Sequence, residues 1–302
     1  MDMGHTITFL WERCRDWYAN TDGILLMFQA SLAVLVFEWI RRRGKLPWSG
    51  LAYSSCFANV LMILMNGALA PIFVILVDWA ETAYSSLSIP HLEASTWQTT
   101  PTWILIPLIL LALDFADYWN HRLMHSSKWF WPIHAIHHSD PHPTVLTTGR
   151  VHLLEPFVMQ VSYILMLSWL NLPYAVLGGV AGLRILHNMY THMNVDWDHG
   201  PFKYLLASPR YHRWHHADEP AAYGMNLANI FPFLDVIFCT YYVPGQCHEK
   251  MGAKGVPTNA LEMVAWPFLE WNRLLTPKYK TIRHPASETS QSSDMVLHSP
   301  QS

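Results

Sequence analysis

Histidines spaced by one helical turn are the feature that most constrains this chain. Residues 114–138 read DFADYWNHRLMHSSKWFWPIHAIHH, in which His121 and His125 form HxxxH and three further histidines form HxxHH. At about 100° per residue, the members of each set lie on one face of a helix. Imidazole rings gathered in this way would pack poorly as a core, whereas imidazole is the commonest nitrogen ligand of metals. The stretch therefore predicts metal binding.

A second HxxHH lies downstream, in SPRYHRWHH. Ser208 followed by Pro209 is typical of a helix N-cap and first turn, and Pro220 follows soon afterwards, so we expect a short helix here. His192 lies between the two regions, with His187 and Asn188 about one turn earlier. The nine candidate metal ligands are His121, His125, His134, His137, His138, His192, His212, His215 and His216.

Nine imidazoles are too many for one ion, since zinc takes about four ligands. Two metal ions with four or five imidazoles each fit the count. The main alternative is a histidine-rich membrane protein that binds metal or haem without being an enzyme, and a pH-sensing array also stays open. A haem cytochrome would need single histidines on facing spans, and a metal transporter would place its histidines within the spans.

The apolar composition predicts an integral membrane protein. Hydrophobic residues make up 51% of the chain and charged residues 14%, whereas soluble domains carry about 25% charged residues. A net charge of -3 with scattered basic residues gives no sign of a nucleic-acid partner. We expect an all-α, multi-span helical protein with one domain over residues 1–284, a motif-bearing core at 105–245 and a disordered tail at 285–302.

Apolar stretches define the expected spans. Three are long enough to cross a bilayer, and two shorter ones, broken at Asn171-Leu172-Pro173, predict a tightly turned helical hairpin. A sixth apolar segment is too short to span and is expected to lie at the interface or against the site. The ranges are 23–40, 51–79 and 102–119 for the spans, 157–170 and 174–186 for the hairpin, and 231–242 for the short segment.

Lysine and arginine alternate along the chain in a way that predicts the orientation. Residues 41–45 hold four basic residues, residues 80–120 hold none, and basic residues return beside the histidine groups. Because basic residues concentrate on the cytoplasmic side, this alternation places the histidine-rich cap in the cytoplasm. The membrane would be a bacterial inner membrane or the endoplasmic reticulum.

Acidic residues near the histidines are candidates for orienting them, because ligating imidazoles usually donate their second N–H to a carboxylate or a carbonyl. Asp117 lies one turn before His121, late in an apolar span, where acids are costly and usually functional. We therefore predict that Asp117 supports catalysis by bonding His121. Glu155, Asp196 and Asp218 are weaker candidates for the same kind of role.

The ordered set of motifs resembles the fatty acid hydroxylase and sterol desaturase superfamily of membrane di-iron enzymes. The matching segments are DFADYWNHRLMH, IHAIHHSD, GRVHLLE, SPRYHRWHH and YGMNLANIFPFLDVIFCTYYVP. Leu153 stands where the family usually has proline, and Cys239 where it has glycine. In some members the lone histidine is the second of an HxxxH pair. The first position of that pair is Asn188 in this chain, with His187 beside it, so these are the two places where a tenth ligand could lie.

The resemblance implies two iron ions, O2 as co-substrate and a lipid substrate drawn from the bilayer. It also implies an external electron donor, of the ferredoxin or cytochrome b5 type with its reductase. The reactions of the superfamily are hydroxylation or desaturation of fatty acyl chains, sterols and related lipids. The motifs do not choose among these substrates.

Overall fold

The computed structural model describes residues 50–276 except residue 173, together with five isolated residues between 29 and 40. The regular elements of this part of the chain are helices, as the apolar stretches predict. The α-helices are α3 (Gly50–Ser86), α4 (Thr102–Ser126), α5 (Trp131–His138), α6 (Glu155–Leu170), α7 (Tyr174–Thr191), α8 (Pro209–His215), α9 (Phe233–Ile237) and α10 (Ala260–Leu275). Short 3-10 helices are η1 (Ala94–Trp97), η2 (Val145–Gly149), η3 (Gly200–Phe202) and η4 (Pro220–Ala222).

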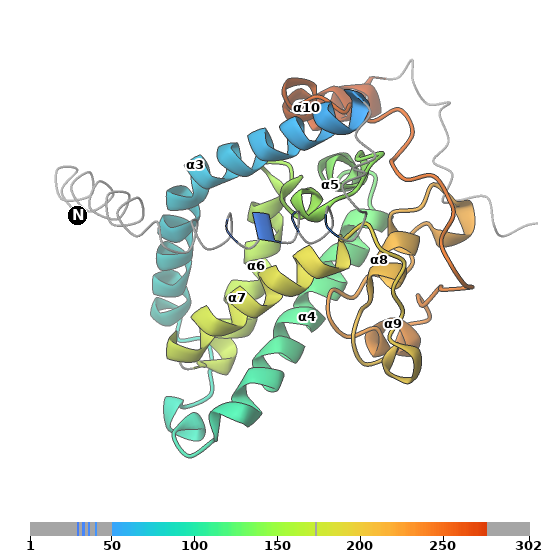
Figure 1. Cartoon of the computed structure of the whole chain (residues 1–302). Helices are drawn as coiled ribbons and strands as arrows, with labels where there is room; N and C mark the ends of the chain where they lie inside the picture. Colours follow the sequence, from blue (N-terminus) through green and yellow to red (C-terminus); the bar gives the residue numbers. More distant parts are fainter. Residues whose placement is uncertain are drawn as a thin grey trace, which may run out of the picture.

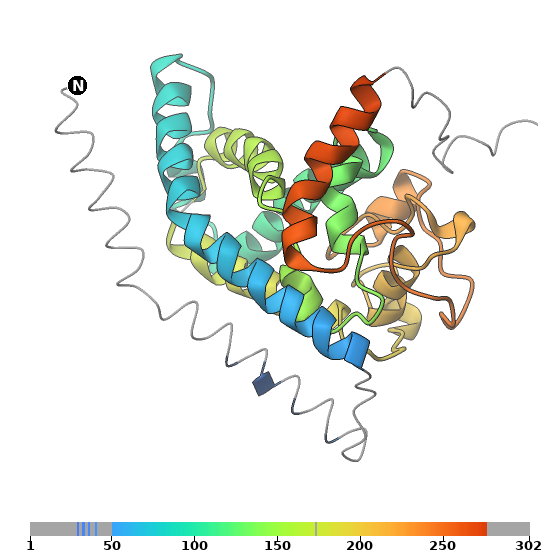
Figure 2. The same cartoon turned by 90° about the horizontal axis from the view of Figure 1, so that it is seen from above.

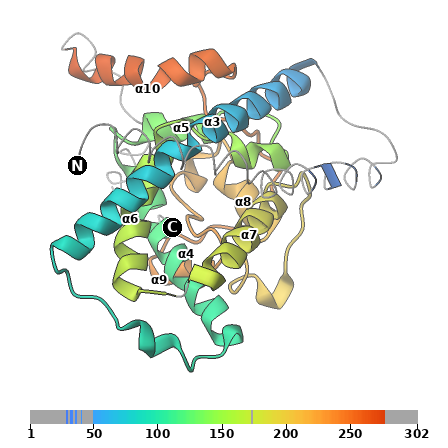
Figure 3. The same cartoon turned by 90° about the vertical axis from the view of Figure 1, so that its left-hand side faces the viewer.

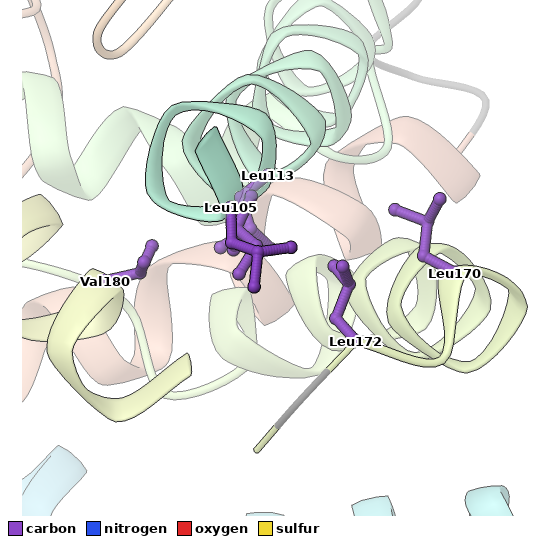
Figure 4. Packing of buried hydrophobic residues seen from close by; sticks show 6 residues of the cluster. Leu105, Leu113, Leu170, Leu172 and Val180 are labelled. Atoms are coloured by element: carbon purple, nitrogen blue, oxygen red, sulfur yellow. The ribbon is translucent and has the colours of Figure 1, made fainter. Parts of the chain in front are cut away.

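Three apolar helices, α4, α6 and α7, pack into the central bundle (Figure 4). Their core contains Leu105, Ile109, Leu113, Leu170, Leu172 and Val180. The expected break is confirmed: α6 ends at Leu170, and Asn171 caps it with φ 48°, in the left-handed region that asparagine tolerates. The chain can therefore reverse within a few residues and return as α7. The two helices each pack against α4 rather than against one another as a close-packed hairpin.

Two helices are long and apolar enough to cross a membrane, through the windows Tyr53–Ala70 of α3 and Thr102–Ser126 of α4. Only 22% and 39% of these windows are buried inside the molecule, so much of each apolar surface stays uncovered. The core helix of a soluble protein would be mostly buried. The expected span at 23–40, apart from its few described residues, and the tail at 285–302 lie outside the described part of the chain.

Helix α3 lies along one side of the molecule (Figure 2) and bends along its length (Figure 1). It contains Pro71, which lacks the amide hydrogen for one intrahelical bond, and a bend is the usual result. Near its beginning, α3 packs against α5 and α10 through Ala58, Met62, Ile136 and Met263. Figure 3 shows α10 lying above α5 and beside α3.

Helices α5, α8 and α9 and their loops form a cap at one end of α4, whereas η1 lies at the other end (Figure 1). The short apolar segment at 231–242 contains α9, and its Leu234 packs with Tyr118 of α4 and Leu227. That segment is therefore part of the cap and packs beside the histidine-bearing helix α4. This agrees with the second of the two expected placements, against the site.

Candidate metal centre

Helices place the histidines as their spacing predicts. His121 and His125 lie on the last turns of α4, three histidines lie on α5, and His192 directly follows α7. The second HxxHH opens on α8, where the Ser208 side chain accepts a hydrogen bond from the amide of Tyr211 and Pro209 occupies the first turn. The predicted cap and short helix are confirmed.

The structure gathers all nine predicted histidines into two groups that could each hold a metal ion. In each group the ligand nitrogens lie within 4.8 Å of one another. The first, called the five-histidine group, is His121, His125, His134, His138 and His215. The second, called the four-histidine group, is His137, His192, His212 and His216.

Each HxxHH triplet contributes to both groups. On α5, His134 and His138 enter the five-histidine group, while His137 enters the other. On α8 and its C-cap the assignment is reversed: His212 and His216 enter the four-histidine group, while His215 enters the five-histidine group. Residues four apart differ by about 40° around a helix, whereas adjacent residues differ by about 100°, so the i, i+4 pair stays together and the third ring turns away.

The Nε2 atoms converge within each group. Three pairs in the five-histidine group are His121–His134 at 2.9 Å, His121–His125 at 3.2 Å and His134–His138 at 3.2 Å. Three in the four-histidine group are His137–His192 at 3.3 Å, His192–His212 at 3.0 Å and His212–His216 at 3.0 Å. Two nitrogens about 2.1 Å from one ion lie about 3.0 Å apart at 90° and about 3.4 Å apart at the tetrahedral angle. The spacing of these pairs is compatible with one transition-metal ion in each group.

Hydrogen bonds to main-chain carbonyls fix which nitrogens are free to bind metal. His121 donates from Nδ1 to Leu227 O at 2.7 Å, His215 to Met225 O at 2.8 Å, and His192 to Asn188 O at 2.8 Å. A neutral imidazole carries one N–H, which in these rings is at Nδ1, so the Nε2 of each ring carries a free lone pair. The buried Nε2 of His215 has no hydrogen-bond partner, and that of His121 faces the Nε2 of His134. Lone pairs directed together in this way repel unless a cation lies between them.

Burial keeps the imidazoles outside α4 in their neutral, metal-binding form. Desolvation lowers the pKa of His192 to about 4. Desolvation is also the largest effect on His134, His137, His138 and the three histidines of the second HxxHH, and it holds their pKa well below the usual value, with neighbouring imidazoles adding to it. Neutral rings keep a lone pair available at neutral pH.

Glu155 orients one ligand of the five-histidine group. Its Oε1 accepts a hydrogen bond from Nδ1 of His134 at 2.9 Å, and both side chains are buried. This weaker candidate is therefore a carboxylate partner of a histidine in the group. The other two weaker candidates have different partners: Asp196 pairs with Arg210, and Asp218 bonds Tyr223 and Lys254.

The contact predicted between Asp117 and His121 is not formed. The buried Asp117 carboxylate accepts hydrogen bonds from the Tyr163 hydroxyl of α6 and the Arg184 guanidinium of α7. The Nδ1 of His121 instead donates to Leu227 O. Asp117 faces the neighbouring helices rather than its own next turn because the Arg184 charge lies there, and the pair neutralises itself within the bundle.

His187 and Asn188, the two places considered for a tenth ligand, are engaged elsewhere. His187 lies outside both groups and bonds Ala207 O through Nε2 at 3.2 Å. Asn188 contributes its main-chain carbonyl to His192. At His187 and Asn188, the structure thus adds an orienting carbonyl but no tenth imidazole.

A buried polar network that the sequence reasoning missed supports α5. Arg150 is fully buried and donates to Ile136 O at 3.2 Å and to Ser139 Oγ at 2.9 Å, at the end of the helix. It also donates to Asn59 of α3 at 2.8 Å. Asp140 accepts hydrogen bonds from the side chains of Asn59, Ser55 and Thr147. The GRVHLLE motif marks Arg150 in the sequence, but nothing local marks its distant partners on α3.

Two further buried acids hold the loop that passes over the end of α4. Asp114 accepts from the amides of residues 229, 230 and 231, at 2.7 to 2.9 Å. Asp235 accepts from the amides of Leu227 and Ala228. In the same loop Cys239 has φ 58°, which glycine adopts without strain and which explains why glycine is usual at this place in the superfamily. The acids hold in place the carbonyl that faces His121.

Comparison with known proteins supports the same interpretation. A family model described as fatty acid hydroxylase matches residues 106–240, close to the motif-bearing core expected from the sequence. Over this core the chain matches the fatty acid hydroxylase family. The matched region contains both histidine groups, most of α4 and all of α5 to α9.

Several curated proteins similar to the chain act on lipids according to their names. The chain is 27% identical over 256 residues to the ornithine lipid hydroxylase OlsE of Rhizobium tropici, covering 83% of this chain and 74% of that protein. It is 28% identical over 151 residues to an alkylglycerol monooxygenase of Danio rerio, covering 50% and 33%. For the Homo sapiens alkylglycerol monooxygenase the identity is 27% over 211 residues, covering 70% and 45%. The chain thus spans less than half of these two monooxygenases, and no solved structure matches it.

Proposed function

We propose that this protein is an O2-dependent membrane oxidoreductase that hydroxylates a lipid at a pair of histidine-bound iron ions. The observation that carries the proposal is the convergence of Nε2 lone pairs in two adjacent buried groups. Iron fits because imidazole suits it and because the five-histidine group offers more ligands than the four of a tetrahedral zinc site. The names of the relatives point to the same chemistry.

The nine histidines would hold the two ions, which would activate dioxygen and pass the donor's electrons to it. Hydroxylation converts one C–H bond to C–OH, so one oxygen atom enters the lipid and the other leaves as water. An external donor supplies a pair of electrons for this, and solvent a pair of protons. The chain's own contributions are to exclude bulk water by burial and to hold the rings, through Glu155 and the carbonyls of Met225 and Leu227, in the tautomer that binds metal.

Apolar surfaces beside the site support a lipid substrate. A cleft of about 370 Å³ lies between α4 and α6 and is lined by Phe115, Ala116, Trp119, Ser162, Leu165, Met166 and Trp169. Its α4 wall ends at Trp119, two residues before His121 in the chain, and its tryptophans are exposed. An acyl chain in the surrounding bilayer would meet this cleft without passing through water. Hydroxylation is favoured over desaturation because the relatives are named as hydroxylase and monooxygenases.

The proposal includes the membrane arrangement. The chain would be a multi-pass protein with α3 and α4 among its crossings and with the metal centre on the cytoplasmic side, where an electron donor of the ferredoxin or cytochrome b5 type can reach it. The placement of the cap and η1 at opposite ends of α4 supports this (Figure 1). The alternation of basic residues along the chain supplies the orientation.

Metal content and a lipid product test the proposal together. The wild-type chain, purified anaerobically, should hold about two irons, and His137→Ala and His215→Ala should each lose iron and activity because each removes one ligand from a different group. His91→Ala, in the exposed loop near η1, is the matched control. Expression under isotopically heavy dioxygen should give a lipid heavier by one labelled oxygen atom. A single zinc per chain that persists in both variants would refute the proposed function.

A further inference from the structure

Two histidines of the five-histidine group are held by one short piece of main chain. Met225 O accepts from Nδ1 of His215 at 2.8 Å, and Leu227 O accepts from Nδ1 of His121 at 2.7 Å. The two rings come from α8 and α4, far apart in sequence, yet their centroids lie 4.5 Å apart. Residues 225–227, called the carbonyl clamp, thus orient two ligands from different helices at once.

Asn226, between the two carbonyls, gives the clamp its shape. It is fully buried and has φ 58°, in the left-handed region that asparagine enters more readily than most residues. Its backbone turns there, so the carbonyls on either side of it can each serve one of the two adjacent rings. Because a β-branched or bulky residue would resist this conformation, the position restricts the choice of side chain.

The side chain of Asn226 fastens the clamp to the rest of the cap. Its Nδ2 donates to Tyr211 O of α8 at 3.0 Å and to Tyr242 O at 2.7 Å, and its Oδ1 accepts from the Tyr242 amide at 2.8 Å. The main-chain amide of Asn226 donates to Thr240 O at 2.7 Å. The bond to Tyr211 joins the clamp to the helix that carries His215, so clamp and ligand move as one unit.

The four-histidine group has no such connection. Its His192 is oriented by Asn188 O from the preceding turn of its own segment. The buried Nδ1 atoms of His137 and His216 have no hydrogen-bond partner. The clamp carbonyls thus bond rings of the five-histidine group only, so a disturbance of the clamp should weaken that group more than the other, although α8 also carries His212.

We infer that Asn226 is a positioning residue that keeps the five-histidine group competent to bind metal by holding the tautomers of His121 and His215. The inference rests on the proposed function, because it presumes that both groups bind iron. Replacement of Asn226 frees both carbonyls to turn away, and either ring can then move its proton to Nε2, which removes that ligand atom. Loss of partners of this kind typically weakens metal binding about 10–100-fold.

Iron titration of variants of the full chain tests this role. After anaerobic loading with ferrous iron, the wild-type chain should hold about two ions, and Asn226→Ala about one at concentrations that saturate the four-histidine group. Mössbauer spectra should change from a coupled pair to an isolated ion. Asn171→Ala is the matched control, because Asn171 is also a left-handed asparagine that donates to a main-chain carbonyl, but it lies at the turn between α6 and α7.

The outcomes separate the possibilities. Two tightly held ions in a folded Asn226→Ala chain would overturn the inference, as would an equal loss in Asn171→Ala. If circular dichroism shows that Asn226→Ala does not fold, Asn226→Asp decides, since it keeps the acceptor for Tyr242 and the left-handed preference but loses both donated bonds. The aspartate variant should bind its second ion more weakly than wild type, and unchanged binding would overturn the inference. A wild-type chain that binds no iron would instead refute the proposed function.

Discussion

Replacement of Glu155 probes how the five-histidine group holds its ligands. The Glu155 carboxylate is buried and bonds Nδ1 of His134 at 2.9 Å. In Glu155→Leu this N–H has no acceptor, and the ring can recover a hydrogen bond only by changing tautomer, which directs Nε2–H into the group. We expect metal affinity to fall about 10–100-fold, equivalent to about 1.4–2.7 kcal/mol.

Glu155→Gln distinguishes orientation from charge. The amide oxygen can still accept from His134, so the loss of affinity should stay below about 10-fold if orientation dominates. The assay is competition between the protein and a chromophoric chelator for ferrous iron, with circular dichroism to confirm folding. Glu262→Gln, at an exposed position on α10, is the control. Wild-type affinity in a folded Glu155→Leu chain would refute the reasoning, and equal losses in both Glu155 variants would show that charge rather than orientation matters.

Three further outcomes follow from contacts elsewhere. Asp117→Asn should lower the thermal unfolding temperature but leave iron content unchanged, because Asp117 pairs with Arg184 rather than with a ligand; lost iron in a folded variant would contradict this. In a chain whose native cysteines are replaced by serine, Ser88→Cys and Ser126→Cys should be labelled from opposite sides of sealed vesicles. Ser88 lies in the loop before α4 and Ser126 is the last residue of α4, both are exposed, and the 25 residues of α4 extend about 37 Å. Labelling of both from one side would refute the topology. Arg150→Met should destabilise folding by on the order of 3 kcal/mol in chemical denaturation, because it breaks the buried network under α5; a loss below about 1 kcal/mol would show that the network is dispensable.

Local features of the site were predictable because they depend on helical periodicity. The HxxxH and HxxHH spacings place rings on one face without reference to any other part of the chain, and Ser208 with Pro209 marks the start of α8 in the same way. The end of α6 at Asn171 is equally local. These features lie within a few residues, where the allowed backbone angles leave few choices.

Long-range contacts could not be predicted in this way. Asp117 lies one turn from His121, and the sequence alone pairs them, but the packing of α7 against α4 brings Arg184 closer. The division of each HxxHH between two groups also depends on how α5 faces α8. Asn226 lies in a segment that resembles the superfamily, but nothing local shows its role, because its importance comes from carbonyls that meet rings of two distant helices.

The sharing of each HxxHH between two groups also limits how the chain can vary in length. An inserted residue between His134 and His137 would rotate the following rings by about 100° and displace ligands of both groups together. The same holds for α8, whereas the loops that join the helices can absorb extra residues at a small entropic cost. Insertions and deletions among natural variants should therefore spare these two short helices, even where the surrounding loops differ greatly in length.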